Sequence, residues 1–157
     1  MNVRKFRPNN RLSTLIKQKG GVLAQDAIAA AERGVESLRE SSLAALDQTL
    51  AEIDRRFGKD ALGRQAETFD ALYLLGSRII DVGAFVSDSG VDKAAVSLCT
   101  LADDCAETGA WRWDAVDVHL NALRLLRSVG ASLPADQREA MLEGLYQVSH
   151  FHRPEEA

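Results

Sequence analysis

Residues 69–88, which read FDALYLLGSRIIDVGAFVSD, form the richest apolar stretch of the chain and predict its fold. Apolar and small side chains recur there at alternating steps of three and four, which places them on one face of an α-helix: Phe69, Leu72, Gly76, Ile79, Gly83 and Val86. A second row on the opposite side mixes acids with small residues: Asp70, Leu74, Ser77, Asp81, Ala84 and Asp88. We therefore expect a core helix, over about 64–87, whose back is open to water or to a partner.

Length and composition indicate one all-α domain. The chain has 157 residues, enough to bury most of its apolar surface without a metal or a disulfide. Its three prolines stand at Pro8, Pro134 and Pro154, and Ala, Leu, Glu, Asp and Arg dominate the rest, as in helical proteins. The net charge is only -4 and the charged residues are spread along the chain, so no basic field argues for nucleic acid.

The cysteines and the hydropathy pattern predict a cytoplasmic protein. Cys99 and Cys105 are six apart on one expected helix and point in different directions, so they are interpreted as free core thiols. Thiols without a disulfide framework are typical of a reducing compartment. No apolar run reaches the length of a membrane span, and residues 12–16 are too short and too broken for a secretion signal.

The first third of the chain is predicted to be a basic arm followed by a helix. Residues 1–21 carry six basic residues before the first acid, and a short helix near residue 10 would either lie on the core or bind a partner or a membrane surface. In 22–58 a near-heptad spacing over Ile28 to Leu38 resumes from Leu43 to Phe57 after a slip near Ser41. This segment is predicted to be either one long helix, which would suggest a dimer or an arm, or two separate helices.

The remainder is predicted to be an antiparallel four-helix-bundle core over 64–149, with the N-terminal helices added to it and a polar tail at 150–157. A glycine-bounded loop at 58–63 precedes the core helix, and further helices are expected over 91–107, over 111–128 and from Pro134 to about 149. The helix over 91–107 has a clear inward face, made of Ala94, Ala95, Leu98, Cys99, Leu101, Ala102 and Cys105. The last helix is expected to bury Met141, Leu142, Leu145 and Val148.

No motif indicates catalysis, a metal or a cofactor. His150 and His152 are two apart at a helix end, where they point in different directions. His119 lies beside an apolar stripe and is interpreted as a structural residue. Trp111 and Trp113 are interpreted as packing anchors. Phosphate-binding glycine motifs that follow a strand are not expected in a chain without strands.

The order of long helix, Ser-Gly turn, Ala-rich helix and Trp-led helix resembles a bacterial histidine-phosphotransfer (HPt) domain, a four-helix bundle of two-component signalling. The phosphoacceptor pattern of that family, His-x-Leu-Lys-Gly-Ala/Ser-Ala-Gly, falls on residues 77–84, SRIIDVGA. An apolar residue is kept at Ile79 and a small one at Gly83, but Ser77 stands in place of the histidine, Ile80 of the lysine and Asp81 of the glycine. The frame LYLLGSRII, with AAVSLCTLADDC and VHLNALRLL, is more similar to the small chemotaxis-associated CheE-like proteins of alphaproteobacteria.

The resemblance implies a degenerate, non-enzymatic HPt-like domain. Phosphoryl transfer needs a neutral imidazole and a nearby cation, whereas this helix offers a hydroxyl and a carboxylate. What remains is a surface for a response-regulator receiver domain or a histidine-kinase component. We expect that surface to consist of Tyr73, Leu74, Ser77, Arg78, Ile80, Asp81 and Ala84. The alternative is a self-associating scaffold, a homodimer through a coiled coil over 25–57.

Overall fold

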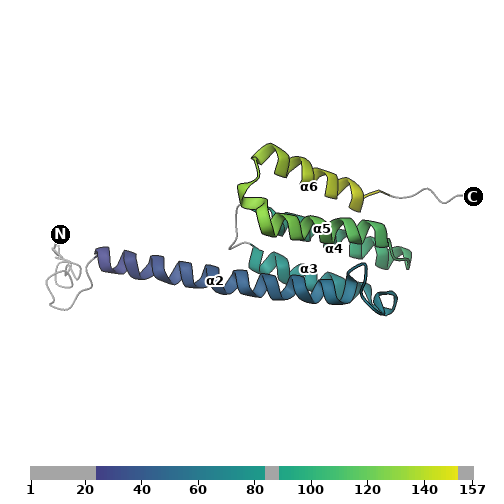
Figure 1. Cartoon of the computed structure of the whole chain (residues 1–157), viewed down its shortest axis with the longest axis horizontal. Coiled ribbons are helices and arrows are strands. Elements are labelled where there is room, and N and C mark those ends of the chain that lie inside the picture. The colour runs from purple at the N-terminus through teal and green to yellow at the C-terminus, as the bar shows by residue number, and fades with distance from the viewer. Residues whose placement is uncertain (1–23, 84–88, 152–157) are drawn as a thin grey trace, which may run out of the picture. The chain divides into compact units, whose positions relative to one another are not determined.

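The structure is a computed structural model that describes residues 24–83 and 89–151 (Figure 1). Those residues form α-helices, short 3₁₀ turns and connecting segments, and no strand occurs among them, which confirms the all-α prediction. The chain divides into two compact units, 1–36 and 37–157, whose boundary falls inside the helix α2 (Ala24–Phe57). The predicted basic arm, Ala84, Val86 and most of the polar tail lie outside the described residues.

Helix α2 runs through Ser41 without a break, so the segment is one helix of 34 residues. The hydroxyl of Ser41 donates a hydrogen bond to the carbonyl oxygen of Leu38, at 2.9 Å, and is therefore satisfied within the helix. Gly34 lowers the stability of the helix by only about 1 kcal/mol relative to an alanine at the same position. From Leu46 onward, four side chains at steps of four, three and four are buried: Leu46, Leu50, Ile53 and Phe57.

Helix α3 (Phe69–Gly83) begins later than the sequence suggests. Residues Arg64–Ala66 form the 3₁₀ turn η1, and Glu67 then adopts an extended conformation, with ψ of 152°, which ends the turn. The hydroxyl of Thr68 accepts a hydrogen bond from the backbone N–H of Ala71 at 3.3 Å, as a helix N-cap does. The prediction of a continuous helix from residue 64 was therefore wrong.

Helix α4 (Val91–Thr108) matches its predicted span to within one residue. It is bounded by Gly90, with φ of 78°, and Gly109, with φ of 65°, a left-handed conformation that favours glycine. Helix α5 (Trp113–Val129), the turn η3 (Gly130–Ser132) and helix α6 (Ala135–Ser149) complete the described fold, and Pro134 directly precedes α6. No helix in the described ranges is long and apolar enough to cross a bilayer.

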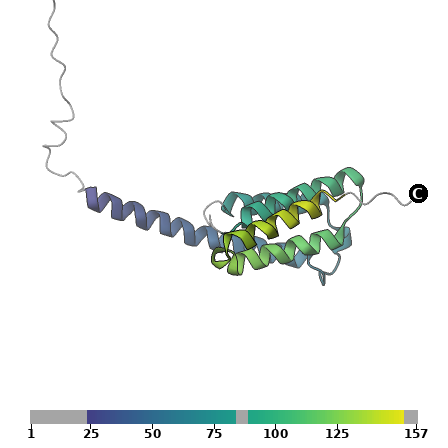
Figure 2. The same ribbon diagram turned by 90° about the horizontal axis from the view of Figure 1, so that it is seen from above.

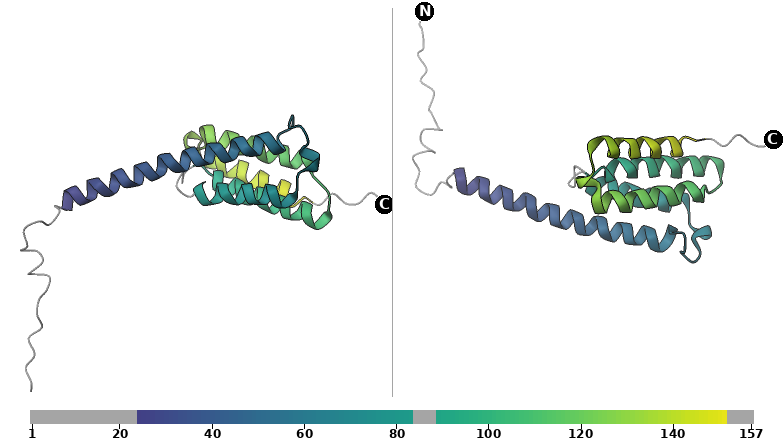
Figure 3. Two further views of the ribbon diagram at one scale, coloured as in Figure 1. Left: turned by 90° about the horizontal axis from the view of Figure 1, so that it is seen from below. Right: turned by 45° about the horizontal axis from the view of Figure 1, so that its top comes forward.

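The core of the unit 37–157 is centred on α4. Helix α3 packs along α4, α4 also contacts α5 and α6, and the second half of α2 lies beside them (Figure 2, Figure 3). All seven side chains predicted to face inward on α4 are buried. Of the four residues predicted to be buried on α6, Leu145 is buried, while Met141, Leu142 and Val148 are half-buried.

An aromatic cluster joins the end of α2 to the starts of α3 and α5. The ring centroid of Trp111 lies 4.5 Å from that of Phe69, 4.4 Å from that of Trp113 and 6.0 Å from that of Phe57. The two tryptophans are thus packing anchors, as predicted. Their phenylalanine partners come from distant parts of the chain, so the cluster could not be found by searching the sequence around them.

Candidate partner-binding surface

The predicted surface lies on α3, and the structure describes six of its seven residues. Leu74 is 60% exposed and Tyr73 is 40% exposed. Arg78 and Asp81 are also exposed, whereas Ser77 and Ile80 are half-buried. The opposite face of α3 is buried, through Leu72, Leu75, Gly76, Ile79 and Gly83. The helical period therefore places the core face and the open face as expected.

The partial burial of Ser77 follows from how closely α3 and α4 pack. A Cβ atom on Gly76 would lie only 2.6 Å from the Sγ atom of Cys99, so glycine is what allows the close approach. The thiol of Cys99 lies 3.6 Å from the carbonyl oxygen of Tyr73. Burial raises the pKa of the Cys99 thiol above its ordinary value, while a hydrogen bond with Ser77 acts in the opposite direction. This cysteine is therefore held as a neutral thiol within the core.

The described surface consists of two neighbouring rows. Tyr73, Ser77 and Ile80 are spaced at i, i+4 and i+7, and the contacts of Tyr73 and Ser77 with Cys99 place this row next to α4. Leu74, Arg78 and Asp81 follow at the same spacing one residue later and form the outer row. We call these six residues the α3 face. It combines two exposed apolar side chains with charges of both signs.

The six residues of the α3 face include no histidine. Ser77, at the position of the phosphoacceptor in the resembling family, supplies a hydroxyl that is engaged by Cys99. An aliphatic hydroxyl is a weak nucleophile unless a neighbouring base removes its proton. Asp81, one turn further along, would repel an incoming phosphoryl group.

His119 of α5 lies inside the core, away from any surface. Its side chain is fully buried, its Nδ1 lies 2.8 Å from the carbonyl oxygen of Ala115, and its Nε2 lies 2.9 Å from the hydroxyl of Ser97. Because a carbonyl oxygen can only accept, Nδ1 carries the proton and Nε2 accepts from Ser97. The hydroxyl of Ser149 lies 3.2 Å from that of Ser97. The cluster links α4, α5 and α6 and has a structural role.

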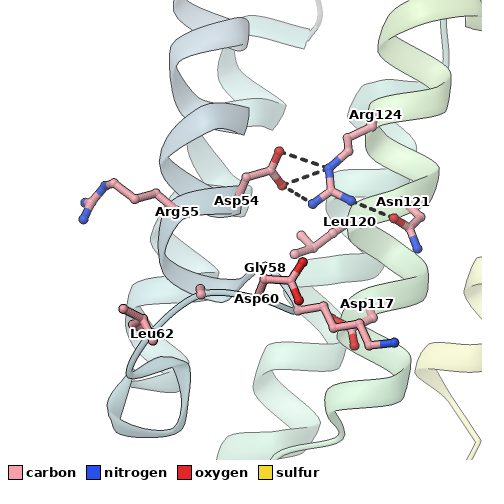
Figure 4. Close-up of a pocket in the computed structure, with 11 residues that line it drawn as sticks. Asp54, Arg55, Gly58, Asp60, Leu62, Asp117, Leu120, Asn121 and Arg124 are labelled. Atoms are coloured by element: carbon pink, nitrogen blue, oxygen red, sulfur yellow. Dashed lines mark hydrogen bonds and ion pairs between the residues drawn. The ribbon is translucent and has the colours of Figure 1, made fainter.

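A hollow of about 730 Å³ lies between the end of α2 and α5, and nothing in the sequence pointed to it (Figure 4). Arg124 extends across it to Asp54, with its Nε 2.9 Å from Oδ1, and also donates to Oδ1 of Asn121 at 2.6 Å. Such pairs depend on how two helices are rotated against each other, which sequence spacing does not reveal. Arg124 and Asp54 neutralise each other, and no group of three or more potential metal ligands occurs in the described part of the chain.

Comparisons with known proteins add no relative: no family model matches the sequence, and neither a curated protein nor a solved structure matches it.

Proposed function

We propose that the chain is a non-enzymatic binding module of bacterial two-component or chemotaxis signalling in the cytoplasm. In this proposal its helices form an HPt-like antiparallel four-helix bundle that has no phosphoacceptor histidine. The α3 face then binds a response-regulator receiver domain or a histidine-kinase component. The observation that carries the proposal is the α3 face itself, where Tyr73 and Leu74 are exposed beside Arg78 and Asp81 while Ser77 occupies the acceptor position.

The composition of the α3 face suits a protein partner. Interfaces bury apolar and aromatic anchors at their centre, and their polar rims provide orientation and speed of association. Tyr73 and Leu74 are the apolar anchors here, and the side chains of Arg78 and Asp81 flank them. Two exposed apolar residues make a small anchor, so we expect a transient complex of the kind used in signalling.

Binding is tested by titrating the full chain with receiver domains and kinase domains from its own organism. Leu74→Asp should weaken the complex about tenfold or more, because it places a charge at the buried centre of the interface. Leu125 is the matched control, since it is also an exposed helical leucine, at 44%, but belongs to α5. Leu125→Asp should leave the affinity unchanged. Equal effects of the two variants, or no binding by any receiver or kinase domain, would contradict the proposal.

The absence of phosphotransfer needs its own assay. Incubation with a phosphorylated receiver domain should leave the chain unlabelled, because the described histidines are not placed on the α3 face. An acid-labile label on any histidine would overturn the non-enzymatic part of the proposal. A genuine HPt domain, run in parallel with the same receiver, shows that the assay detects transfer.

The alternative function is a scaffold that dimerises through a coiled coil over 25–57. In that alternative, only the first half of the range is free to pair with a second copy. Leu46, Leu50, Ile53 and Phe57 are buried in the core of their own chain and are not available to a second copy. The exposed positions that remain are those from Ile28 to Leu38.

A further inference from the structure

The first half of α2 carries an exposed apolar stripe. Ile28 is 58% exposed, Val35 is 66% exposed and Leu38 is 58% exposed, and Ala31 between them is exposed as well. Their steps of three, four and three place them on one side of the helix. The flanking positions are charged or small, so the stripe is the main apolar feature of this segment.

The first half of α2 lacks the packing that stabilises most helices in proteins. Helices in proteins gain most of their stability by packing an apolar face. In residues 24–41 only Ala29 is even half-buried, and every other side chain is exposed. The segment therefore presents a packing face whose burial would stabilise it.

The stripe has the spacing of a coiled-coil seam and is suited to pairing with itself. Numbering Ile28 and Val35 as a positions makes Ala31 and Leu38 d positions, so the apolar residues of two copies can interdigitate. The small side chains around them favour close approach, and a Cβ atom on Gly34 would meet nothing within 4 Å. A second copy of the same helix thus fits the seam.

The charges beside the seam select the relative direction of the two helices. Glu32 and Arg39 follow the two d positions and are both e positions, seven residues apart. In a parallel pair, e positions face g positions, which are Ala27 and Gly34 here and offer no charge. In an antiparallel pair, e positions face each other, so Glu32 of each copy meets Arg39 of the other.

We propose that two copies of this chain pair in antiparallel orientation through α2, with the pair centred between Val35 and Leu38. Val35 of each copy packs beside Leu38 of the other, and two Glu32–Arg39 ion pairs flank them. The seam is short, so the dimer dissociates on dilution. This pairing does not depend on the proposed function, because it uses a different helix from the α3 face.

Engineered cysteines in the full chain test the orientation. The two native cysteines are buried, so a new exposed thiol is the reactive one under mild oxidation. A mixture of Glu32→Cys and Arg39→Cys chains should form the mixed disulfide dimer several times faster than either variant forms its own. Faster formation of the Glu32→Cys or Arg39→Cys homodimer would overturn the antiparallel arrangement.

The molar mass in solution tests whether two copies pair through the apolar stripe of α2. Light scattering over a dilution series should show a monomer and dimer equilibrium. Val35→Asp should raise the dissociation constant about tenfold or more, because it buries an unpaired charge. Ala30→Asp, at another exposed site on the other side of the helix, should leave the dissociation constant unchanged. A monomer at every concentration, or a dimer insensitive to Val35→Asp, would overturn the proposal, while receiver binding measured on the same variants tests the α3 face separately.

Discussion

At the scale of single residues, His119 shows how the core controls an ionisable group. Burial lowers the pKa of His119 below its ordinary value of 6.5, and the charge of Arg112 lowers it further. The unfolded chain therefore takes up a proton at a higher pH than the folded chain does. The stability that the neutral imidazole contributes is fully present above about pH 6.5 and is lost as the pH falls below that value.

We accordingly expect the free energy of unfolding to decrease between pH 7.5 and pH 5, in part because of His119. Urea titrations of the native chain and of His119→Gln across this range measure the effect. Glutamine keeps a donor and an acceptor but does not titrate, so the variant should show a shallower dependence on pH. If the free energy of unfolding changed with pH in the same way in both proteins, His119 would not be responsible for the pH dependence.

Gly76 allows α3 to pack closely against α4. Gly76→Val should lower the free energy of unfolding by about 1–3 kcal/mol, because the added atoms meet the thiol of Cys99 in a filled core. Gly34→Val is the matched control, since nothing lies within 4 Å of a Cβ atom at that site. Urea unfolding measures the free energy of unfolding of both variants. An equal decrease in the two would contradict the conclusion that Gly76 is needed for close packing of α3 on α4.

At the scale of elements, α6 is held to the core by polar contacts as well as by apolar burial. The guanidinium of Arg112 donates to the carbonyl oxygen of Val148 at 2.6 Å and to that of Ser149 at 3.1 Å, which caps the end of α6. Leu145 is its only large apolar side chain that is fully buried in the described structure. The attachment of α6 should therefore be sensitive to the loss of one arginine.

Arg112→Gln is expected to cost about 1.5–3 kcal/mol, the contribution of hydrogen bonds that involve a charged group. Hydrogen exchange measured by mass spectrometry should show the amides of α6 losing protection before those of α4. Arg55→Gln provides the comparison, because among the described residues Arg55 pairs only with Glu52, on the exposed surface, and such pairs contribute little. Uniform loss of protection over all helices would contradict a local role for Arg112.

The elements also show what the sequence can and cannot predict. The span of α4 was predicted closely because Gly90 and Gly109 adopt left-handed conformations at its two ends. The start of α3 was misplaced, because η1 and the extended Glu67 leave no trace in the apolar period. The continuity of α2 at Ser41 was undecided, since a serine can either interrupt a helix or bond back to it.

The candidate surface was likewise predictable from the sequence only in part. The helical period alone predicted that Leu74 and Asp81 would be exposed and that Ile79 would be buried. It could not predict that Ser77 is half-covered, because the cover comes from Cys99 on another helix. The ion pairs between α2 and α5 were missed for the same reason, since they join residues 70 and 80 positions apart, as in Arg124 with Asp54 and Arg127 with Asp47.

At the scale of the whole molecule, the second half of α2 is an integral part of the core rather than an addition to it. Leu46, Ile53 and Phe57 have no exposed surface, and Leu50 is 9% exposed. They belong to one cluster that extends to Leu145 of α6. Loss of a single large core side chain costs about 2–5 kcal/mol, and a whole domain is stable by only about 5–15 kcal/mol. Removing all four should therefore exceed the stability of the fold.

Two truncations test this conclusion. A chain that begins at residue 37, the start of the second compact unit, should unfold cooperatively in urea, because it retains every buried residue of the core. A chain that begins at residue 58 should show no cooperative transition, since its remaining helices expose the surface that α2 covers. Adding a peptide of residues 37–57 to the shorter chain should restore the transition, because the peptide supplies the four missing side chains. A cooperative transition of the shorter chain by itself would instead place the core entirely within residues 58–157.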